Sequence, residues 1–399
     1  MIYLFVLLLR IVAFLEGTPK IISFIVVFSI IGYSTIKRTP FKDFRKVSKA
    51  KLYSFLLIIF ILIHGLIFGI VYLRDFAVLL TYWLWFVFTY TYMKEKTLEE
   101  GLRYVFFSFL IFNIANYIFF EMYYADQKRG INTIMEFLGI LGYRMYFPLS
   151  SGANVFTFQL GLNALLSLYF IKIKKKNFLY IIAFWFYLFI LVLADSRLIL
   201  SFTIIFSFVY WLSFKTLVIF FKRYWYIISL SIIGFIFVFY NTNLFDSIKR
   251  PAERTGDVIS RIDIWGHALE ILVSDFKLIF GHGLNGLENS LEEGLKSRFE
   301  EQSLQTSHNF IIQNIIDFGL VGIVVILFYV FKLINMLIKI KSEIVTIMIV
   351  MFLLIGTTES IPTFYSFEAT IFVIAIISVI LVIHERKTTR YNQNINSVT

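Results

Sequence analysis

Long apolar runs, separated by short charged connections, recur along most of the 399-residue chain. A helix of about 20 apolar residues is long enough to cross the ~30 Å hydrocarbon core of a membrane. The pattern therefore predicts an all-α, polytopic integral membrane protein with about twelve transmembrane helices and one large extracytoplasmic helical loop. The predicted spans are residues 2–15, 20–36, 52–73, 76–93, 104–121, 153–171, 178–194, 198–214, 225–241, 320–338, 344–358 and 368–383.

The composition excludes a soluble domain. Hydrophobic residues make up 59% of the chain and charged residues 16%, whereas soluble domains carry about 25% charged residues. The chain has no cysteine, which excludes disulfides and thiolate metal sites. No small-residue cleavage site follows the first apolar run, so we expect that run to be a retained helix rather than a signal peptide.

Lysine and arginine are distributed unevenly between the two sides of the predicted bundle. With the N-terminus inside, the cytoplasmic connections and tail hold 22 Lys and Arg residues against six acidic ones, and the outer side holds about 13 against about 20. Because short cytoplasmic loops are enriched in Lys and Arg, we expect both termini to be cytoplasmic. The net charge of +11 then reflects topology, and the basic runs 37–51 and 172–176 face anionic membrane lipids, not nucleic acid.

This topology divides the chain into three parts, of which the middle one is a long polar interruption. The first, residues 1–241, holds transmembrane helices one to nine with an outer loop at 122–152. The second, residues 242–318, is the large extracytoplasmic loop. The third, residues 319–399, holds helices ten to twelve and a cytoplasmic tail.

The polar interruption holds three of the five histidines and is the expected place of any chemistry. Residues 257–276 predict an amphipathic helix in which Arg261 and Trp265 are one turn apart and share a face. A glycine turn, Gly281-His282-Gly283, comes next. A second helix, expected to be solvated because it carries several glutamates, is predicted at 284–304.

The stretch from Thr306 to Gly322 predicts a short helix at the membrane surface. Thr306 or Ser307 is suited to cap its start. Because polar and apolar residues fall on opposite faces, we expect this helix to lie in the interface with its apolar side toward lipid, and Gly319 to turn the chain into the next span. The competing interpretation is one helix over 310–331, which places polar groups in the membrane at a high cost. The polar face comprises His308, Asn309, Gln313, Asn314 and Asp317, and the apolar face Phe310, Ile311, Ile312, Ile315 and Ile316.

His308 lies at the predicted start of this helix. The helix dipole disfavours an imidazolium and favours a nearby anion. A neutral imidazole beside a phosphate site is suited to act as a general base. The alternative is a histidine that only caps the helix or forms a hydrogen bond at the interface.

Five short motifs occur in order on the predicted outer side. They are Gly142-Tyr-Arg144 with a helix start at Asn154, Asp195-Ser196-Arg197, Arg261-Ile-Asp-Ile-Trp265, Phe280-Gly-His-Gly283, and His308-Asn309 followed by Asp317-Phe-Gly319-Leu-Val-Gly322. In this combination they resemble the O-antigen polymerase and O-antigen ligase superfamily of bacterial membrane enzymes. The resemblance covers roughly residues 142–322, and the other spans match only in hydrophobic character.

The resemblance implies glycosyl transfer on the outer face of the bacterial cytoplasmic (inner) membrane, with undecaprenyl-diphosphate-linked oligosaccharides as donor and acceptor. Arg144, Arg197 and Arg261 would bind the diphosphate, because a guanidinium matches phosphate geometry bidentately. His308 would deprotonate the acceptor hydroxyl for an inverting displacement, with Arg261 as the second catalytic residue. Since no Asp-x-Asp-type cluster faces outward, we expect a metal-independent mechanism without a cofactor. The secondary candidates are His282, Asn309, Arg254 and Trp265.

Three functions stay open at this point. A polymerase would join lipid-linked repeats into O-antigen or capsular polysaccharide, with a chain-length regulator protein as a further partner. A ligase would transfer the glycan to lipid A-core. A flippase or transporter of lipid-linked oligosaccharides would carry ionisable groups within its spans, whereas these spans are nearly free of charge apart from Arg10 and Lys332. The motifs favour a polymerase.

Overall fold

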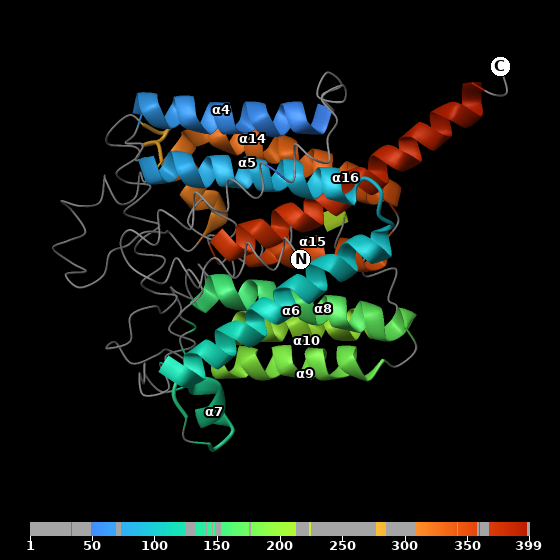
Figure 1. Ribbon diagram of the computed structural model, residues 1–399. Helices are drawn as coiled ribbons and strands as arrows, with labels where there is room; N and C mark the ends of the chain where they lie inside the picture. The colour runs from blue at the N-terminus through green and yellow to red at the C-terminus, as the bar shows by residue number, and fades with distance from the viewer. Residues whose placement is uncertain are drawn as a thin grey trace.

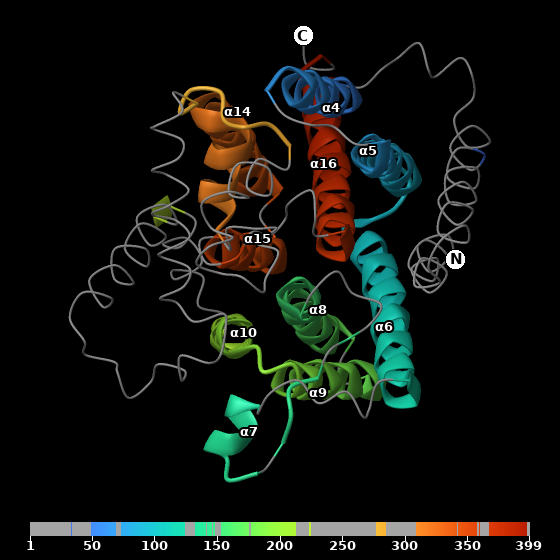
Figure 2. The ribbon, with the colours of Figure 1, turned by 90° about the vertical axis from the view of Figure 1, so that its left-hand side faces the viewer.

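The structure, a computed structural model, confirms the all-α prediction for the part of the chain that it describes. Every regular element of that part is a helix, and the longer helices run side by side in one bundle (Figures 1 and 2). The described residues are 33, 49–68, 73–123, 132–140, 142–145, 147, 153–174, 177–212, 223–224, 277–284, 309–340, 342–356, 359 and 367–396.

Helices occupy nine of the predicted spans, and one short helix, α7, lies in the predicted outer loop. Three predicted spans, 2–15, 20–36 and 225–241, and the predicted helices 257–276 and 284–304 lie outside the described residues, apart from Tyr33 and Leu284. The helices are α4 (Lys49–Phe68), α5 (Leu73–Met93), α6 (Leu98–Tyr123), α7 (Thr133–Phe137), α8 (Ala153–Ile173), α9 (Phe178–Leu193), α10 (Arg197–Trp211), α14 (Phe310–Ile340), α15 (Glu343–Gly356) and α16 (Phe367–Asn396).

Five of these helices are long and apolar enough to cross a membrane on their own, namely α4, α5, α6, α8 and α16. Among the described residues, α9, α10, α15 and the first part of α14 are shorter apolar helices. The membrane character of the bundle therefore agrees with the sequence.

Two helices, α6 and α16, extend beyond their predicted spans. The helix α6 begins at Leu98, earlier than predicted, because Thr97 and Glu100 form a reciprocal capping box: the Thr97 N–H donates to Glu100 Oε2 at 2.8 Å, and the Glu100 N–H donates to Thr97 Oγ1 at 3.2 Å. The helix α16 continues to Asn396, well past its predicted span, and its last turns project beyond the bundle (Figure 1).

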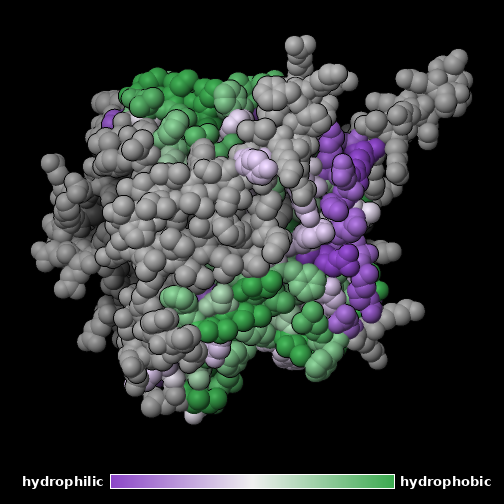
Figure 3. Space-filling view, in the orientation of Figure 1, coloured by the Kyte–Doolittle hydropathy of each residue, from purple (hydrophilic) through white to green (hydrophobic). Residues whose placement is uncertain are grey.

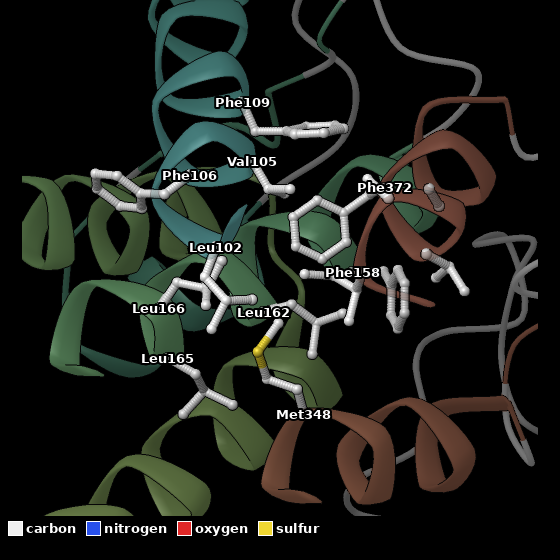
Figure 4. Close-up of a cluster of buried hydrophobic side chains, with 14 of the residues drawn as sticks. Leu102, Val105, Phe106, Phe109, Phe158, Leu162, Leu165, Leu166, Met348 and Phe372 are labelled. Carbon is white, nitrogen blue, oxygen red and sulfur yellow. The ribbon is translucent and has the colours of Figure 1, made fainter. Parts of the chain in front are cut away.

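The core is built around α8. Figure 4 shows apolar side chains of α6, α8, α15 and α16 pointing toward one another. The rings of Phe109 and Phe372 meet edge to face with centroids 4.8 Å apart, an arrangement that aromatic quadrupoles favour. Gly161 of α8 lets α10 and α15 approach, because a Cβ there would lie 2.6 Å from Thr203 Oγ1 and 2.7 Å from Met351 Cε.

One end of the bundle is hydrophilic. Hydrophilic residues gather at the end where α5 meets α6, while apolar surface covers α4 and the lower helices in the same view (Figure 3). A salt bridge of 2.7 Å joins Lys174 to Glu99 at this end. We call it the predicted inner end, and the end that carries α7 the predicted outer end (Figure 1).

The first prediction concerns this orientation. Phe137, at the predicted outer end, is 90% exposed, and Glu95 is exposed at the predicted inner end. Because the chain has no cysteine, Phe137→Cys should react with an impermeant thiol reagent in intact cells, and Glu95→Cys only after permeabilisation. Reaction of Glu95→Cys without permeabilisation, with Phe137→Cys protected, would reverse the topology.

Candidate functional site

The first group of site residues lies where α9 turns into α10. Asn132 Nδ2 donates to the carbonyl oxygens of Val192 and Leu193 at 2.7 and 3.1 Å. The Met145 N–H donates to the Leu193 carbonyl at 2.9 Å. The outer loop is therefore fixed across the end of α9. We call this unit, residues 132–145 with 192–197, the α9–α10 corner.

Asp195 is the centre of the α9–α10 corner. Its φ of 52° lies in the left-handed region, which aspartate tolerates better than most residues. Its carboxylate, 4% exposed, accepts a hydrogen bond from Thr133 Oγ1 at 2.7 Å and one from the Ile134 N–H at 3.1 Å. Asp195 thus holds the start of α7, and Asn132 caps the same helix through its side chain.

Two of the three predicted diphosphate ligands meet at this corner. Arg144 Nε donates to the Ala194 carbonyl at 2.9 Å, and Arg197, three residues further along, is the first residue of α10. Ser196 is buried and donates through Oγ to Thr157 Oγ1 of α8 at 3.0 Å. Arg197 is exposed, so its guanidinium projects from an anchored turn. Asn154 is in the first turn of α8, as predicted.

The second group is built around a break in α14. Gly319 has φ 62° and ψ −159°, so the helix is interrupted there. In an unbroken helix the N–H groups of residues 320 and 321 would donate to the carbonyls of 316 and 317. The break leaves these four groups without intrahelical partners. The prediction that Gly319 redirects the chain is confirmed.

Residues 278–283 supply all four missing partners. The N–H groups of His282 and Gly283 donate to the carbonyls of Ile316 and Asp317 at 2.7 and 2.8 Å. The carbonyls of Leu278 and Ile279 accept from the N–H groups of Leu320 and Val321 at 3.0 and 3.2 Å. Two motifs whose paired residues lie 34 to 42 positions apart in the sequence are therefore one structural unit, which we call the glycine junction: residues 277–284 with 316–321.

The glycines of this junction are required by its geometry. Gly281 has φ 72°, and a Cβ there would lie 2.6 Å from the Gly319 nitrogen and 2.7 Å from the Asp317 carbonyl. A Cβ on Gly319 would collide with the Ile279 carbonyl. Both positions combine a left-handed backbone with direct backbone contact, which only glycine accommodates.

The start of α14 differs from the prediction. The helix begins at Phe310, and Asn309 caps it: Asn309 Oδ1 accepts hydrogen bonds from the N–H groups of Ile311 and Ile312 at 2.9 and 3.0 Å. The cap is therefore not Thr306 or Ser307. Asparagine suits this position because its side-chain oxygen accepts from the N–H groups two and three residues further along the chain.

The polar face of this helix is also placed differently. Asn309, Gln313 and Asp317 are 0%, 1% and 5% exposed, so the face packs inside the protein and not at a solvated interface. Gln313 Nε2 donates to both oxygens of the Asp317 carboxylate at 3.0 and 3.1 Å. Burial within protein removes the cost of placing these groups against lipid. The prediction of a solvated polar face is wrong for this reason.

The remaining candidates divide into described and undescribed residues. His282 is 6% exposed, its Nδ1 lies 3.4 Å from Lys277 Nζ, and its backbone is part of the glycine junction. His308, Arg261, Arg254 and Trp265 lie outside the described residues. The α9–α10 corner and the glycine junction both lie at the predicted outer end, on different sides of it (Figure 2).

One histidine beside the glycine junction was missed by the sequence analysis. His64 of α4 is 5% exposed, and its ring lies 5.2 Å from that of Phe318 between centroids. The available signal was a single ionisable residue inside an apolar span, which is uncommon in membrane helices. Among the described residues, no three His, Asp or Glu side chains come together as a metal site would require.

The second prediction tests the glycine junction. Gly281→Ala and Gly319→Ala should lower the apparent melting temperature of the purified protein strongly. Gly139→Ala is the matched control, because Gly139 has φ 73° but no atom within 4 Å of its Cβ position, so only the backbone cost of about 1–2 kcal/mol applies. Equal shifts of the melting temperature in all three variants would mean that the backbone contacts of the junction contribute nothing to stability.

The comparison with known proteins covers residues of both groups. Residues 182–327 match the model of the O-antigen ligase family. No curated protein and no solved structure matches the chain. The matched range contains the Asp195–Arg197 turn and the whole glycine junction. Residues 182–327 of this helical membrane protein are thus similar to the O-antigen ligase family.

Proposed function

We propose that the protein is a glycosyltransferase that joins undecaprenyl-diphosphate-linked oligosaccharide units into O-antigen or capsular polysaccharide on the outer face of the bacterial cytoplasmic membrane. The observation that carries this proposal is the family match over residues 182–327. The α9–α10 corner supports it, because it presents cationic side chains on an anchored turn at the predicted outer end.

Arg197 is suited to bind the diphosphate of the donor. It lies at the N-terminus of α10, where the helix dipole and unpaired N–H groups favour anions and disfavour a lone cation. An arginine at this position is therefore stabilised when a phosphate joins it. Arg144 uses Nε on the Ala194 carbonyl, which orients its guanidinium at the same corner. We propose Arg261 as the third ligand.

His308 is the proposed general base. It directly precedes Asn309, the cap of α14, so it adjoins the positive end of that helix. The acceptor hydroxyl would lose its proton to His308 as its oxygen attacks the anomeric carbon of the donor. The bond from that carbon to the diphosphate oxygen would break with inversion, and the arginines would stabilise the charge on the departing lipid diphosphate.

A ligase is the second candidate, favoured by the description of the matched family. The two activities differ in the acceptor and not in the chemistry above. Purified protein in liposomes that contain only the lipid-linked repeat should form a ladder of longer lipid-linked glycans if it is a polymerase. If glycan transfer occurs only after lipid A-core is added, the protein is a ligase.

The third prediction concerns Arg197. Loss of a hydrogen bond between charged groups costs about 1.5–3 kcal/mol, so Arg197→Ala should slow glycan extension roughly 10- to 100-fold, with Arg197→Lys in between because it keeps the charge without the bidentate fork. Protein level and melting temperature should not change, since Arg197 is exposed. Arg223→Ala, an exposed arginine in a predicted cytoplasmic connection, is the control. Equal activity of the Arg197 and Arg223 variants would remove Arg197 from the site.

The fourth prediction concerns the base and the absence of a metal. His308→Ala should lower the rate by about 10²–10⁴-fold, the usual contribution of a positioned general base. Arg261→Lys should be impaired and Arg261→Ala more so.

Chelation with EDTA should leave activity unchanged. Loss of activity with EDTA that Mg²⁺ restores would mean that a cation, rather than arginine, neutralises the leaving group.

A further inference from the structure

The helix α4 lies at the edge of the bundle beside α14 (Figure 2) and exposes most of one side. Its connection to the glycine junction is a group of aromatic rings. Phe68 stacks on Phe280 with centroids 4.9 Å apart and an interplanar angle of 6°. His64 lies among these rings, 4.8 Å from Phe68 and 5.2 Å from Phe318 between centroids.

His64 differs from its neighbours because it carries polar atoms. The side chain is 5% exposed, and neither Nδ1 nor Nε2 forms a hydrogen bond within the described structure. A buried polar group without a partner lowers stability, because its lost hydration is not replaced by a hydrogen bond within the protein. A phenylalanine at this position would fit the aromatic group without that cost, so packing alone does not account for a histidine.

A suitable partner is next to the ring. The His64 side chain lies beside the backbone of Phe280. Within residues 277–280, the carbonyl of Lys277 accepts from Gly281, and those of Leu278 and Ile279 accept from α14. The Phe280 carbonyl accepts no such bond among the described residues. The His64 ring and the backbone of Phe280 therefore lie next to each other where α4 contacts the glycine junction.

We propose that His64 is a positioning residue, whose ring N–H closes onto the Phe280 carbonyl and so connects α4 to the glycine junction. A neutral imidazole has one N–H donor, which is all that this bond needs. The junction holds both parts of α14, so the bond fixes the start of that helix, at Asn309, relative to α4. The consequence for catalysis rests on the function proposed above, whereas the bond itself does not.

The fifth prediction separates a hydrogen bond from packing. Leu284, 1% exposed at the end of the junction, is replaced by cysteine, and thiol labelling of the purified protein reports opening of residues 277–284. In this background His64→Phe keeps the aromatic packing and loses the donor, and His64→Gln keeps a donor and loses the ring. We expect His64→Phe to label about five- to tenfold faster, and His64→Gln to label close to the parent rate.

The opposite order, with His64→Gln faster and His64→Phe unchanged, would show that His64 acts by packing and overturn the proposal, as would equal rates in all three proteins. If Leu284→Cys does not fold, trypsin cleavage after the exposed Lys277 measures the same opening in the cysteine-free chain, with the same expected order. Glycan extension should be slower in His64→Phe than in the parent protein and close to the parent rate in His64→Gln. An active His308→Ala variant would remove the proposed base but leave the labelling result intact, so the two proposals fail separately.

Discussion

The four backbone hydrogen bonds of the glycine junction are the constraint that positions the start of α14 at the predicted outer end. A helix that breaks at membrane depth leaves carbonyl and N–H groups that lipid cannot satisfy. Here the turn at residues 278–283 supplies two donors and two acceptors to the break at Gly319. The turn and the start of α14 therefore cannot move independently, and Asn309 is held in a defined place although it begins a helix at the edge of the bundle.

At the α9–α10 corner, side-chain hydrogen bonds help to hold the turn in place. Asp195 adopts a left-handed backbone, which costs free energy and persists only where the surroundings over-determine it. The surroundings are the start of α7, bound by the Asp195 carboxylate, and α8, bound by Ser196. The result is a rigid turn whose next residue, Arg197, is exposed at the positive end of a helix. Rigidity matters here because an anchored backbone leaves only the side chain of Arg197 to lose entropy when it binds an anion.

The sequence predicted much of this architecture, but not how its parts contact one another. Apolar runs located the helices, and the helix break at Gly319 followed from glycine's freedom to adopt positive φ. The same pattern could not reveal that the Gly281 turn pairs with that break, because backbone pairing between distant segments leaves no periodic signal. The polar row ending at Asp317 was assigned to solvent, since periodicity shows which residues share a face but not what covers it. His64 was overlooked because hydropathy treats a single histidine as an interruption too small to matter.

The family match covers both anchored turns. It begins within α9, whose end carries Asp195, and ends within α14 beyond Gly319. It therefore includes the Asp195–Arg197 turn and the glycine junction. Hydrophobic packing such as that of α6 with α16 accepts many combinations of apolar residues of suitable volume. A left-handed glycine in contact with another backbone accepts no substitute. The two glycines of the junction should therefore tolerate substitution less than the apolar residues that pack the bundle.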